Sequence, residues 1–539
     1  DCSLIKGQVQ FFELTSELED VSSTRIRNNI DLNRDISNLI APMAQNFIYE
    51  QGLYMREPQY KKYIDQENLF FQTTILPNGS MMLTASTKGD SPQEYGKLIY
   101  HLLHQAELWD EFEDMDTIAY IRTYSSGAMI VIDQLQVKKD SPVLNLEQAL
   151  LTEALSGFLM DEFSHVLCHF QNVSNETRLF LEPLFLRHGF KTISEEKSNS
   201  YISLVDMHYP LIVIRDVETV IKAPLSKNKR VRETIHKTNE KLQLALTAFY
   251  PGNLVLAFSS QHMQQRLLER IATENQVSLV PAVPTNLGGK MCVPFGTILR
   301  DTLVPNTVTK ALHTAKIFEP DASFSQIEES LNYAPLSTQI RTIQAFNRPV
   351  ILVDDLLHKG ARMQKLAPML KNAQIDIDKV MVGIMSGTGK DLMNLNQQAC
   401  DSIYFIPNLR HWFTISSLYP FIGGDTVRRE YKSIAGISPA INLILPFVAN
   451  PFFKDASKEA LFHVSFVCLK NAKHICRVLE EEYQQEFERN LTLNRLSEVM
   501  VDPCFPDVGV HVKYDLNLPS SAFIENSIEQ LERTRNLTL

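Results

Sequence analysis

The stretch RPVILVDDLLHKGARMQKLAPMLKNA, residues 348–373, sets three elements in a row. Its apolar run VILV is typical of a buried strand, and a loop with Gly360 separates this run from a helical pattern. A second apolar run, KVMVGIM at 379–385, follows the helical pattern. This strand–helix–strand order predicts a parallel sheet, in which ligands bind at the carboxyl ends of the strands. The acid pair Asp354 and Asp355 stands at such an end.

Two acids, a short loop and a helix start together suit a ribose phosphate. Carboxylates accept hydrogen bonds from sugar hydroxyls, while loop amides and a helix N-terminus bind phosphate. The residues alone leave one alternative open, in which Asp354 and Asp355 only cap the following helix.

The stretch resembles the type I phosphoribosyltransferases, whose motif is four apolar residues, D-D, two residues and T-T-G-x-T. The resemblance implies that Asp354 and Asp355 contact ribose. It also implies a phosphate loop made of His358, Lys359, Gly360, Ala361 and Arg362. Histidine, lysine and arginine replace the threonines of the family's loop, and cationic side chains still suit phosphate.

The same resemblance places further parts of the domain upstream. NLVLAFSS at 253–260, the helical pattern at 263–275 and VSLVPAV at 277–283 predict more of the parallel sheet. The family's pyrophosphate loop falls at 259–262, where no glycine occurs. The stretch 288–321 stands where the family keeps a mobile catalytic loop. Its polar residues are Arg300, Asn306, Thr307, Thr309, Lys310, His313 and Lys316.

Two later stretches invite other interpretations. GIMSGTGKDLM at 383–393 is similar to a Walker A loop, but its spacing is one residue off and Asp391 replaces the hydroxyl residue that holds magnesium. We expect a strand-end loop there instead. In 408–430, Trp412 and Phe413 could stack on a base or similar ring, or could pack in the core.

Residues 61–215 alternate between strand-like and helix-like patterns. The expected elements are strands at 116–124 and 128–137, a helix at 146–163, a strand at 164–170 and a helix at 175–190 that ends at Gly189. This order, with Asn172 or Asn175 before the last helix and F-L-R-H-G-F at its end, resembles the acetyl-CoA-dependent N-acetyltransferases.

That family binds the cofactor pyrophosphate on the amides of a glycine-rich loop. The matching loop here, 137–150, has no glycine, although Lys138 and Lys139 could attract an anion. We therefore expect an acetyltransferase-like module for which acetyl-CoA is an unlikely cofactor. His165 and His169 are expected to be satisfied core histidines.

VSSTRIRNNI at 21–30 precedes a helical pattern at 36–54. Serine and threonine supply an N-cap, the amides of a helix N-terminus favour anions, and Arg25 and Arg27 can add charge-assisted bonds. A plain helix cap is the alternative that the residues leave open.

The stretch resembles the C-terminal end of the nucleotidyltransferases, in particular nicotinate-mononucleotide adenylyltransferase. That family carries I-S-S-T-x-I-R, a helix and an L-V-P…Y-I…L-Y ending, and this chain has VSSTRIR at 21–27, LIAP at 39–42, F-I at 47–48 and G-L-Y at 52–54. The resemblance implies triphosphate contacts by Ser22, Ser23, Thr24 and Arg27. The family's H-x-G-H motif belongs in a Rossmann-like half upstream of this stretch, so the resemblance implies that the chain is the C-terminal portion of a longer enzyme.

Composition bounds the remaining classes. The chain has 539 residues, 44% of them apolar, and a net charge of −11, so we expect about three domains and no broad nucleic-acid footprint. The basic stretch at 226–237 is expected to be a solvated helix face. Seven cysteines without a C-x-x-C pair predict reduced thiols and a cytoplasmic protein. The most apolar run, 441–453, is too short for a membrane span.

These observations predict a multidomain α/β protein with a helical N-terminal remnant and a helical C-terminal segment. The expected domains are a nucleotidyltransferase end at 1–55, an N-acetyltransferase-like α+β module at 56–215, a phosphoribosyltransferase-like parallel sheet at 216–450 and a helical segment at 451–539. The order resembles large bacterial cytidyltransferase-related proteins.

The leading hypothesis is therefore a nucleotide-handling transferase that binds a phosphorylated ribose or nucleotide with Mg²⁺. The competing hypothesis is a non-catalytic scaffold or nucleotide sensor built from degenerate enzyme folds. Neither hypothesis needs nucleic acid or a membrane as a partner, and both leave a homo-oligomer open.

Overall fold

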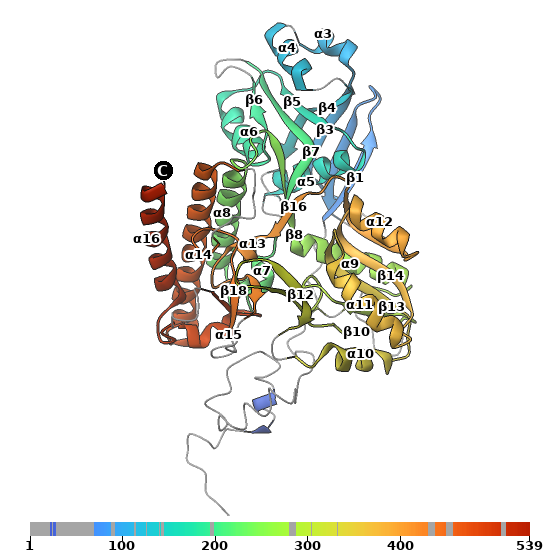
Figure 1. The fold of residues 1–539 in the computed structure, drawn as a ribbon. Helices are drawn as coiled ribbons and strands as arrows, with labels where there is room; N and C mark the ends of the chain where they lie inside the picture. The colour runs from blue at the N-terminus through green and yellow to red at the C-terminus, as the bar shows by residue number, and fades with distance from the viewer. Residues whose placement is uncertain are drawn as a thin grey trace, which may run out of the picture.

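The computed structural model describes residues 22–23, 25–27, 69–87, 92–112, 115–124, 127–138, 141, 145–193, 199–279, 287–302, 304–330, 333–428, 437–448, 456–507 and 514–538. Within these residues the strands form three sheets, and helices pack between and around them (Figure 1). The chain is therefore mixed α/β, as the sequence predicts. The predicted N-terminal remnant at 1–55 lies outside the described residues except for residues 22–23 and 25–27, of which 23 and 25–27 are helical.

The first sheet is built around one long strand, β7. Its main path runs through β1 (Leu69–Ile75), β2 (Met81–Thr87), β3 (Glu94–Leu103), β4 (Met129–Val137), β5 (His165–Phe170), β7 (Tyr201–Arg215) and β16 (His411–Thr414). Two further strands, β6 (Lys191–Thr192) and β8 (Asn253–Ser259), also pair with β7. Strands β4 and β5 are parallel and are joined through α5 (Leu146–Met160), and α6 (Asn175–Arg187) follows β5.

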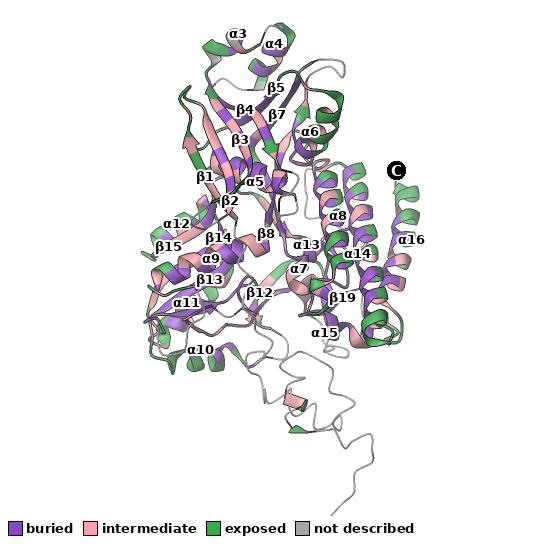
Figure 2. Ribbon diagram, turned by 180° about the vertical axis from the view of Figure 1, so that it is seen from behind, coloured by how far each residue is buried: buried purple, intermediate pink, exposed green. Residues whose placement is uncertain are grey.

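Helix α5 lies in the interior between the first sheet and the second. Leu150, Leu151 and Leu155 are fully buried, and the core around them includes Ile214 of β7 and Ile351 of the second sheet. A helix with apolar side chains on several faces is stable when neighbouring elements bury each of those faces. This packing joins the first and second sheets through one hydrophobic core (Figure 2).

One predicted strand in this region is wrong. The stretch DTIAYIRTY forms helix α4 (Met115–Tyr124), preceded by the short helix α3 (Leu108–Glu111). Ile118 and Ile121 are its buried apolar residues, and their spacing of three matches one face of a helix rather than the alternation of a strand. Both helices cover one face of β3, β4 and β5.

The second sheet is the predicted parallel sheet. Its strands are β10 (Val308–Thr309), β9 (Met291–Pro294), β13 (Val350–Leu357), β14 (Ile377–Ser386) and β15 (Cys400–Ile406), in that order. They are joined or flanked by α9 (Ser260–Glu274), α10 (Leu336–Gln344), α11 (Ala361–Asn372) and α12 (Gly387–Leu395). The apolar runs at β13 and β14 are buried along most of their length, as expected for a sheet covered on both faces.

Two expectations about this sheet are corrected. The strand at NLVLAFSS exists as β8, but it pairs in parallel with β7 of the first sheet. Residues 277–279 of VSLVPAV form no strand, and 280–283 lie outside the described residues. The sheet position next to β13 is taken instead by β9.

The third sheet was not predicted. It consists of β12 (Phe324–Glu329), β11 (Thr314–Phe318), β17 (Asp425–Val427), β18 (Ser438–Ile441) and β19 (Cys504–Pro506). The stretch 288–321, expected to be a mobile loop, therefore supplies β9, β10 and β11. The C-terminal segment is not purely helical either, because β19 pairs with β18.

Three helices form a layer on one side of the molecule (Figure 1). These are α8 (Lys229–Leu246), α14 (Lys458–Phe487) and α16 (Ser520–Thr538). The short helices α7 (Val217–Val220), α13 (Ile415–Leu418) and α15 (Leu496–Val499) connect this layer to the sheets. Most of the basic stretch at 226–237 forms the first half of α8, and the buried residues of this helix pack in one core with those of α14.

No helix among the described residues has the length and apolar character that a membrane crossing requires. The cysteines in this part of the chain are unpaired, as the sequence predicts.

Candidate functional site

A cavity of about 800 Å³ lies where the carboxyl ends of parallel strands from two sheets converge. Strands β7, β8 and β16 of the first sheet end there, and so do β9 and β13 of the second. The third sheet contributes a wall through β11 and β17. Strand ends of this kind are where α/β proteins bind ligands.

The acid pair of β13 is divided between the cavity and the interior. Asp355 lines the cavity, whereas the carboxylate of Asp354 is 5% exposed and turned toward Arg362. Adjacent side chains of a strand point to opposite faces, so one acid of a consecutive pair faces inward. Burial raises the pKa of Asp354 to about 6, against the opposing effect of the Arg362 charge.

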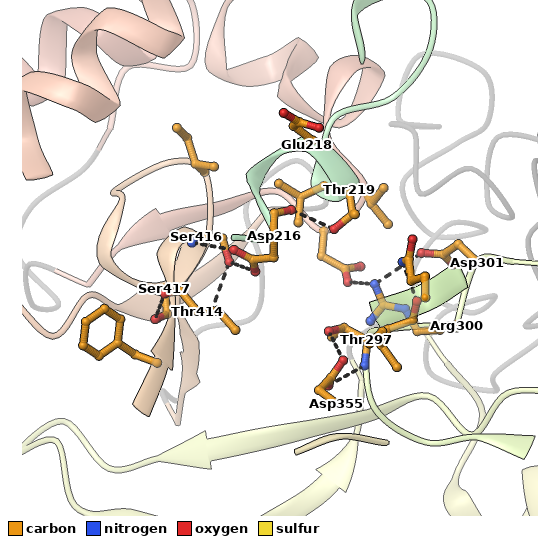
Figure 3. A pocket seen from close by; sticks show the side chains of 18 of the residues that line it. Asp216, Glu218, Thr219, Thr297, Arg300, Asp301, Asp355, Thr414, Ser416 and Ser417 are labelled. Carbon is orange, nitrogen blue, oxygen red and sulfur yellow. Dashed lines mark hydrogen bonds and ion pairs between the residues drawn. The ribbon is translucent and has the colours of Figure 1, made fainter. Parts of the chain in front are cut away.

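Asp355 is held by the turn that follows β9. Thr297 donates two hydrogen bonds to its carboxylate, from the backbone N–H at 2.9 Å and from the hydroxyl at 3.0 Å (Figure 3). The turn can approach so closely because residue 296 is glycine. A Cβ at Gly296 would collide with both carboxylates of the pair.

Arg362 is the one residue of the predicted phosphate loop that lines the cavity. Its Nη1 donates to Asp354 Oδ1 at 2.7 Å and lies 3.5 Å from Asp355 Oδ2. Burial alone would lower the pKa of Arg362, but the neighbouring carboxylates outweigh burial and raise it. Its Nε is buried and, among the described residues, has no hydrogen-bond partner.

Lys316 on β11 brings a second cation to the cavity. Its Nζ lies 4.5 Å from the ring centroid of Trp412, and within the described part of the chain it makes no hydrogen bond or ion pair. Burial lowers the pKa of Lys316 and the charge of Arg362 lowers it further, while Asp425 opposes the shift. A largely buried ammonium group without a carboxylate partner destabilises the folded protein unless an anionic group binds next to it.

The opposite wall carries a buried carboxyl at the end of β7. Asp216 accepts hydrogen bonds from the backbone N–H of Ser416, at 2.9 Å, and from its hydroxyl (Figure 3). Burial raises the pKa of Asp216 to about 6, against the hydrogen bonds from Ser416. At the rim, Arg300 pairs with Asp502.

The remaining residues of the predicted phosphate loop lie outside the cavity lining. His358 Nδ1 is 2.9 Å from the hydroxyl of Ser386, which caps α12 through Gly389. GIMSGTGKDLM is the end of β14 followed directly by α12, so the strand-end loop expected there is replaced by the start of a helix. Gly360 adopts φ 68° at the start of α11, and no side chain caps that helix. The amides of the first turn of α11 remain available to an anion.

The predicted triphosphate contacts lie elsewhere. Ser22 accepts a hydrogen bond from the N–H of Arg25 at 3.1 Å, and Arg27 donates to the carbonyl of Ser23 at 3.1 Å. The first is the geometry of a helix cap, which was the alternative interpretation. Thr24 lies outside the described residues, and a nucleotide contact by this turn stays a prediction.

The loop expected to hold acetyl-CoA is only partly described, but the first turn of α5 after it is covered by α8. Gln148 donates to Gln243 at 2.6 Å, and Asn145 contacts His236. His169, expected to be a satisfied core histidine, is buried and bonded to Glu111 at 2.7 Å.

Sequence reasoning named Arg300 and Lys316 only as polar residues of a long stretch, and missed Asp216 and Thr297. Two signals could have found the missed pair. IVIRD at the end of β7 repeats the pattern of an apolar strand followed by an acid, and VPFGT places a glycine and a hydroxyl directly after β9.

No protein-family model matches the sequence, and no curated protein matches it. Parts of the chain are similar to three solved structures, among others. Arabidopsis thaliana NAA60 in complex with acetyl-CoA is 17% identical over 24% of this chain and 76% of that chain, with a TM-score of 0.18. A GNAT-family acetyltransferase from Listeria monocytogenes is 14% identical over 23% and 64%, with a TM-score of 0.18. FeeM, an N-acyl amino acid synthase from uncultured soil microbes, is 12% identical over 24% and 72%, with a TM-score of 0.19. At these scores the likeness carries no argument about this chain's fold or activity.

Proposed function

We propose that the cavity binds a phosphorylated ribose compound, such as a mononucleotide or phosphoribosyl pyrophosphate, as the ligand of a nucleotide-handling transferase. The observation that carries the proposal is Lys316, a largely buried cation without an anionic partner beside the unsatisfied Nε of Arg362. A ligand phosphate would supply the acceptor that both groups lack.

Each part of the ligand has a counterpart in the lining. The phosphate would lie between Lys316 and Arg362, the two cations that the third and second sheets bring to the lining. Asp355 would accept hydrogen bonds from ribose hydroxyls, with Thr297 holding its carboxylate in place. A volume of about 800 Å³ lies within the range of small-ligand sites.

Magnesium would enter with the ligand rather than before it. Among the described residues, groups of three or more potential metal ligands occur only away from this cavity. Mg²⁺ is usually held by one or two carboxylates together with substrate phosphates. Asp355 and Asp425 are the lining carboxylates on the Lys316 side that fit this role.

Calorimetric titration with ribose 5-phosphate, AMP, and phosphoribosyl pyrophosphate with Mg²⁺ tests the proposal. We expect saturable binding of at least one of them, and Asp355→Asn should weaken it about 10-fold or more, since a hydrogen bond to a charged group contributes about 1.5–3 kcal/mol. The matched control is Asp391→Asn, an exposed carboxylate on α12 outside the cavity. Absence of binding at millimolar ligand, or equal losses in both variants, would contradict the proposal.

A second function, a sensor that binds without turnover, is favoured by one observation. Asp354 forms an ion pair with Arg362 and does not line the cavity, so only one of the two acids expected to contact ribose can do so. Incubation of the protein with phosphoribosyl pyrophosphate, Mg²⁺ and a mixture of nucleobases separates the two functions. Consumption of the ligand supports the transferase, whereas binding without consumption supports the sensor.

A further inference from the structure

A cluster of histidine and carboxylate side chains lies on the first sheet, on the face covered by α3 and α4. Its members are His101 on β3, Asp133 on β4, His169 on β5 and Glu111 at the end of α3. Four separate elements thus bring one metal-ligating side chain each to the same place.

The geometry follows from the strand register. His101 and Asp133 are on neighbouring antiparallel strands, and the ladder between β3 and β4 shifts by one residue beside Asp133. Bulges of this kind re-aim side chains and are frequent next to functional sites. The parallel pairing of β4 with β5 ends at Ile132 and Cys168, which makes Asp133 and His169 the next residues in register.

The ligand atoms of His101, Glu111 and Asp133 all lie within 4.8 Å of one another. A metal ion about 2.0–2.2 Å from each ligand needs separations only slightly smaller, which rotation of the side chains can supply. The three side chains are 26%, 23% and 33% exposed, so an ion can enter from solvent. The His169 side chain is 7% exposed, and its Nδ1 lies 2.7 Å from the Glu111 carboxylate, as a residue that orients a metal ligand does.

We infer that His101, Glu111 and Asp133 form a binding site for a divalent transition-metal ion, with His169 orienting Glu111. One imidazole and two carboxylates suit Zn²⁺, Co²⁺, Mn²⁺ or Fe²⁺ better than Ca²⁺ or Mg²⁺, which prefer oxygen ligands alone. Three protein ligands leave at least one position for water or another ligand.

A second cluster on the same sheet serves as the contrast. His165, Asp206 and His208 also lie within 4.8 Å of one another, but His208 is 49% exposed and bonded to Asp206, only two residues away. This cluster is largely a local pair on one strand, so it offers less preorganisation to an ion.

The test is titration of the full chain, without a histidine tag and after treatment with a chelator, with Co²⁺ and Zn²⁺. We expect one equivalent of Co²⁺ with visible d–d absorption, displaced by Zn²⁺. His169→Gln should weaken Co²⁺ binding roughly 10–100-fold, as is typical when the residue that orients a metal ligand is lost. Asp133→Asn removes a ligand itself and should weaken binding more than that. His208→Ala, the control, should leave binding unchanged.

Three outcomes would overturn the inference: no Co²⁺ binding at millimolar metal, unchanged affinity in Asp133→Asn, or a loss in His208→Ala alone. Far-ultraviolet circular dichroism of each variant shows whether it is folded. If Asp133→Asn does not fold, His101→Gln takes its place, with the same expected loss.

Discussion

Replacing Lys316 by methionine tests two effects of its buried charge, which should lower the stability of the free protein and strengthen phosphate binding. Methionine keeps the length and apolar stem of the side chain and removes the ammonium group. Two unit charges about 4 Å apart attract by about 4 kcal/mol at an effective dielectric of 20, and the net value of a charge-assisted hydrogen bond is about 1.5–3 kcal/mol. We therefore expect Lys316→Met to weaken ribose 5-phosphate binding about 10- to 150-fold.

The same substitution should stabilise the free protein. Burial lowers the pKa of Lys316, so the folded state binds the proton less tightly than the unfolded chain does. The buried charge therefore lowers the free energy of unfolding by its full amount below the pKa of the folded state. This destabilisation disappears as the pH approaches 10.5, the pKa of lysine in the unfolded chain. Lys316→Met should raise Tm at pH 7, and this gain should shrink as the pH rises.

Calorimetry with ribose 5-phosphate and thermal unfolding at several pH values are the assays. Lys390→Met is the matched control, because Lys390 also lies over an aromatic ring, 4.8 Å from the centroid of Phe405, but is exposed on α12. A change in affinity of less than about threefold in Lys316→Met, or an equal loss in Lys390→Met, would refute the reasoning; 1.4 kcal/mol corresponds to tenfold in affinity.

Two further predictions concern the acids around the cavity. The folded protein should lose stability as the pH rises from about 4 to about 6, because the buried Asp216 resists ionisation. Asp216→Asn should remove this part of the loss. The pKa of this carboxyl is 3.8 in the unfolded chain and about 6 in the folded protein, which corresponds to at most about 3 kcal/mol in the free energy of unfolding. Urea unfolding at pH 4.5 and pH 7 measures the effect. Identical pH dependence in the original protein and in Asp216→Asn would contradict the prediction. Gly296→Ala should destabilise by about 1–3 kcal/mol and weaken ribose 5-phosphate binding, because its Cβ would meet the carboxylates of Asp354 and Asp355. Gly289→Ala, where a Cβ meets open space, should do neither, and equal effects in both would count against the role of Gly296.

Local patterns in the sequence predicted the individual elements well where one face or one period dominates. The parallel strands β13 and β14 and the helices α5, α6, α9 and α11 all follow from apolar runs and periodicity. Helix α4 was mistaken for a strand because DTIAYIRTY is short enough for either period to fit.

Pairing between distant segments could not be predicted in the same way. Strand β8 has the apolar character of any buried parallel strand, so its sequence does not say which sheet it joins. The strands of the third sheet are short and come from residues 314–506, and their ladders depend on tertiary contacts.

The candidate site was therefore predicted in part. The acid pair predicted a site at the end of β13, where Asp355 lines the cavity, and ribose binding there stays a prediction. Which acid faces the cavity depends on the pleat of one strand, and Lys316 arrives from a sheet that the sequence did not reveal.

The pairing of β7 has a mechanical consequence. The first half of this strand pairs with β5 and β6 and the second half with β8 and β16, so a ladder of backbone hydrogen bonds joins the two modules predicted on either side of residue 215. The two modules cannot swing apart at that point without breaking this ladder. The wall that carries Lys316 and Asp425 belongs to a separate sheet, which this ladder does not hold.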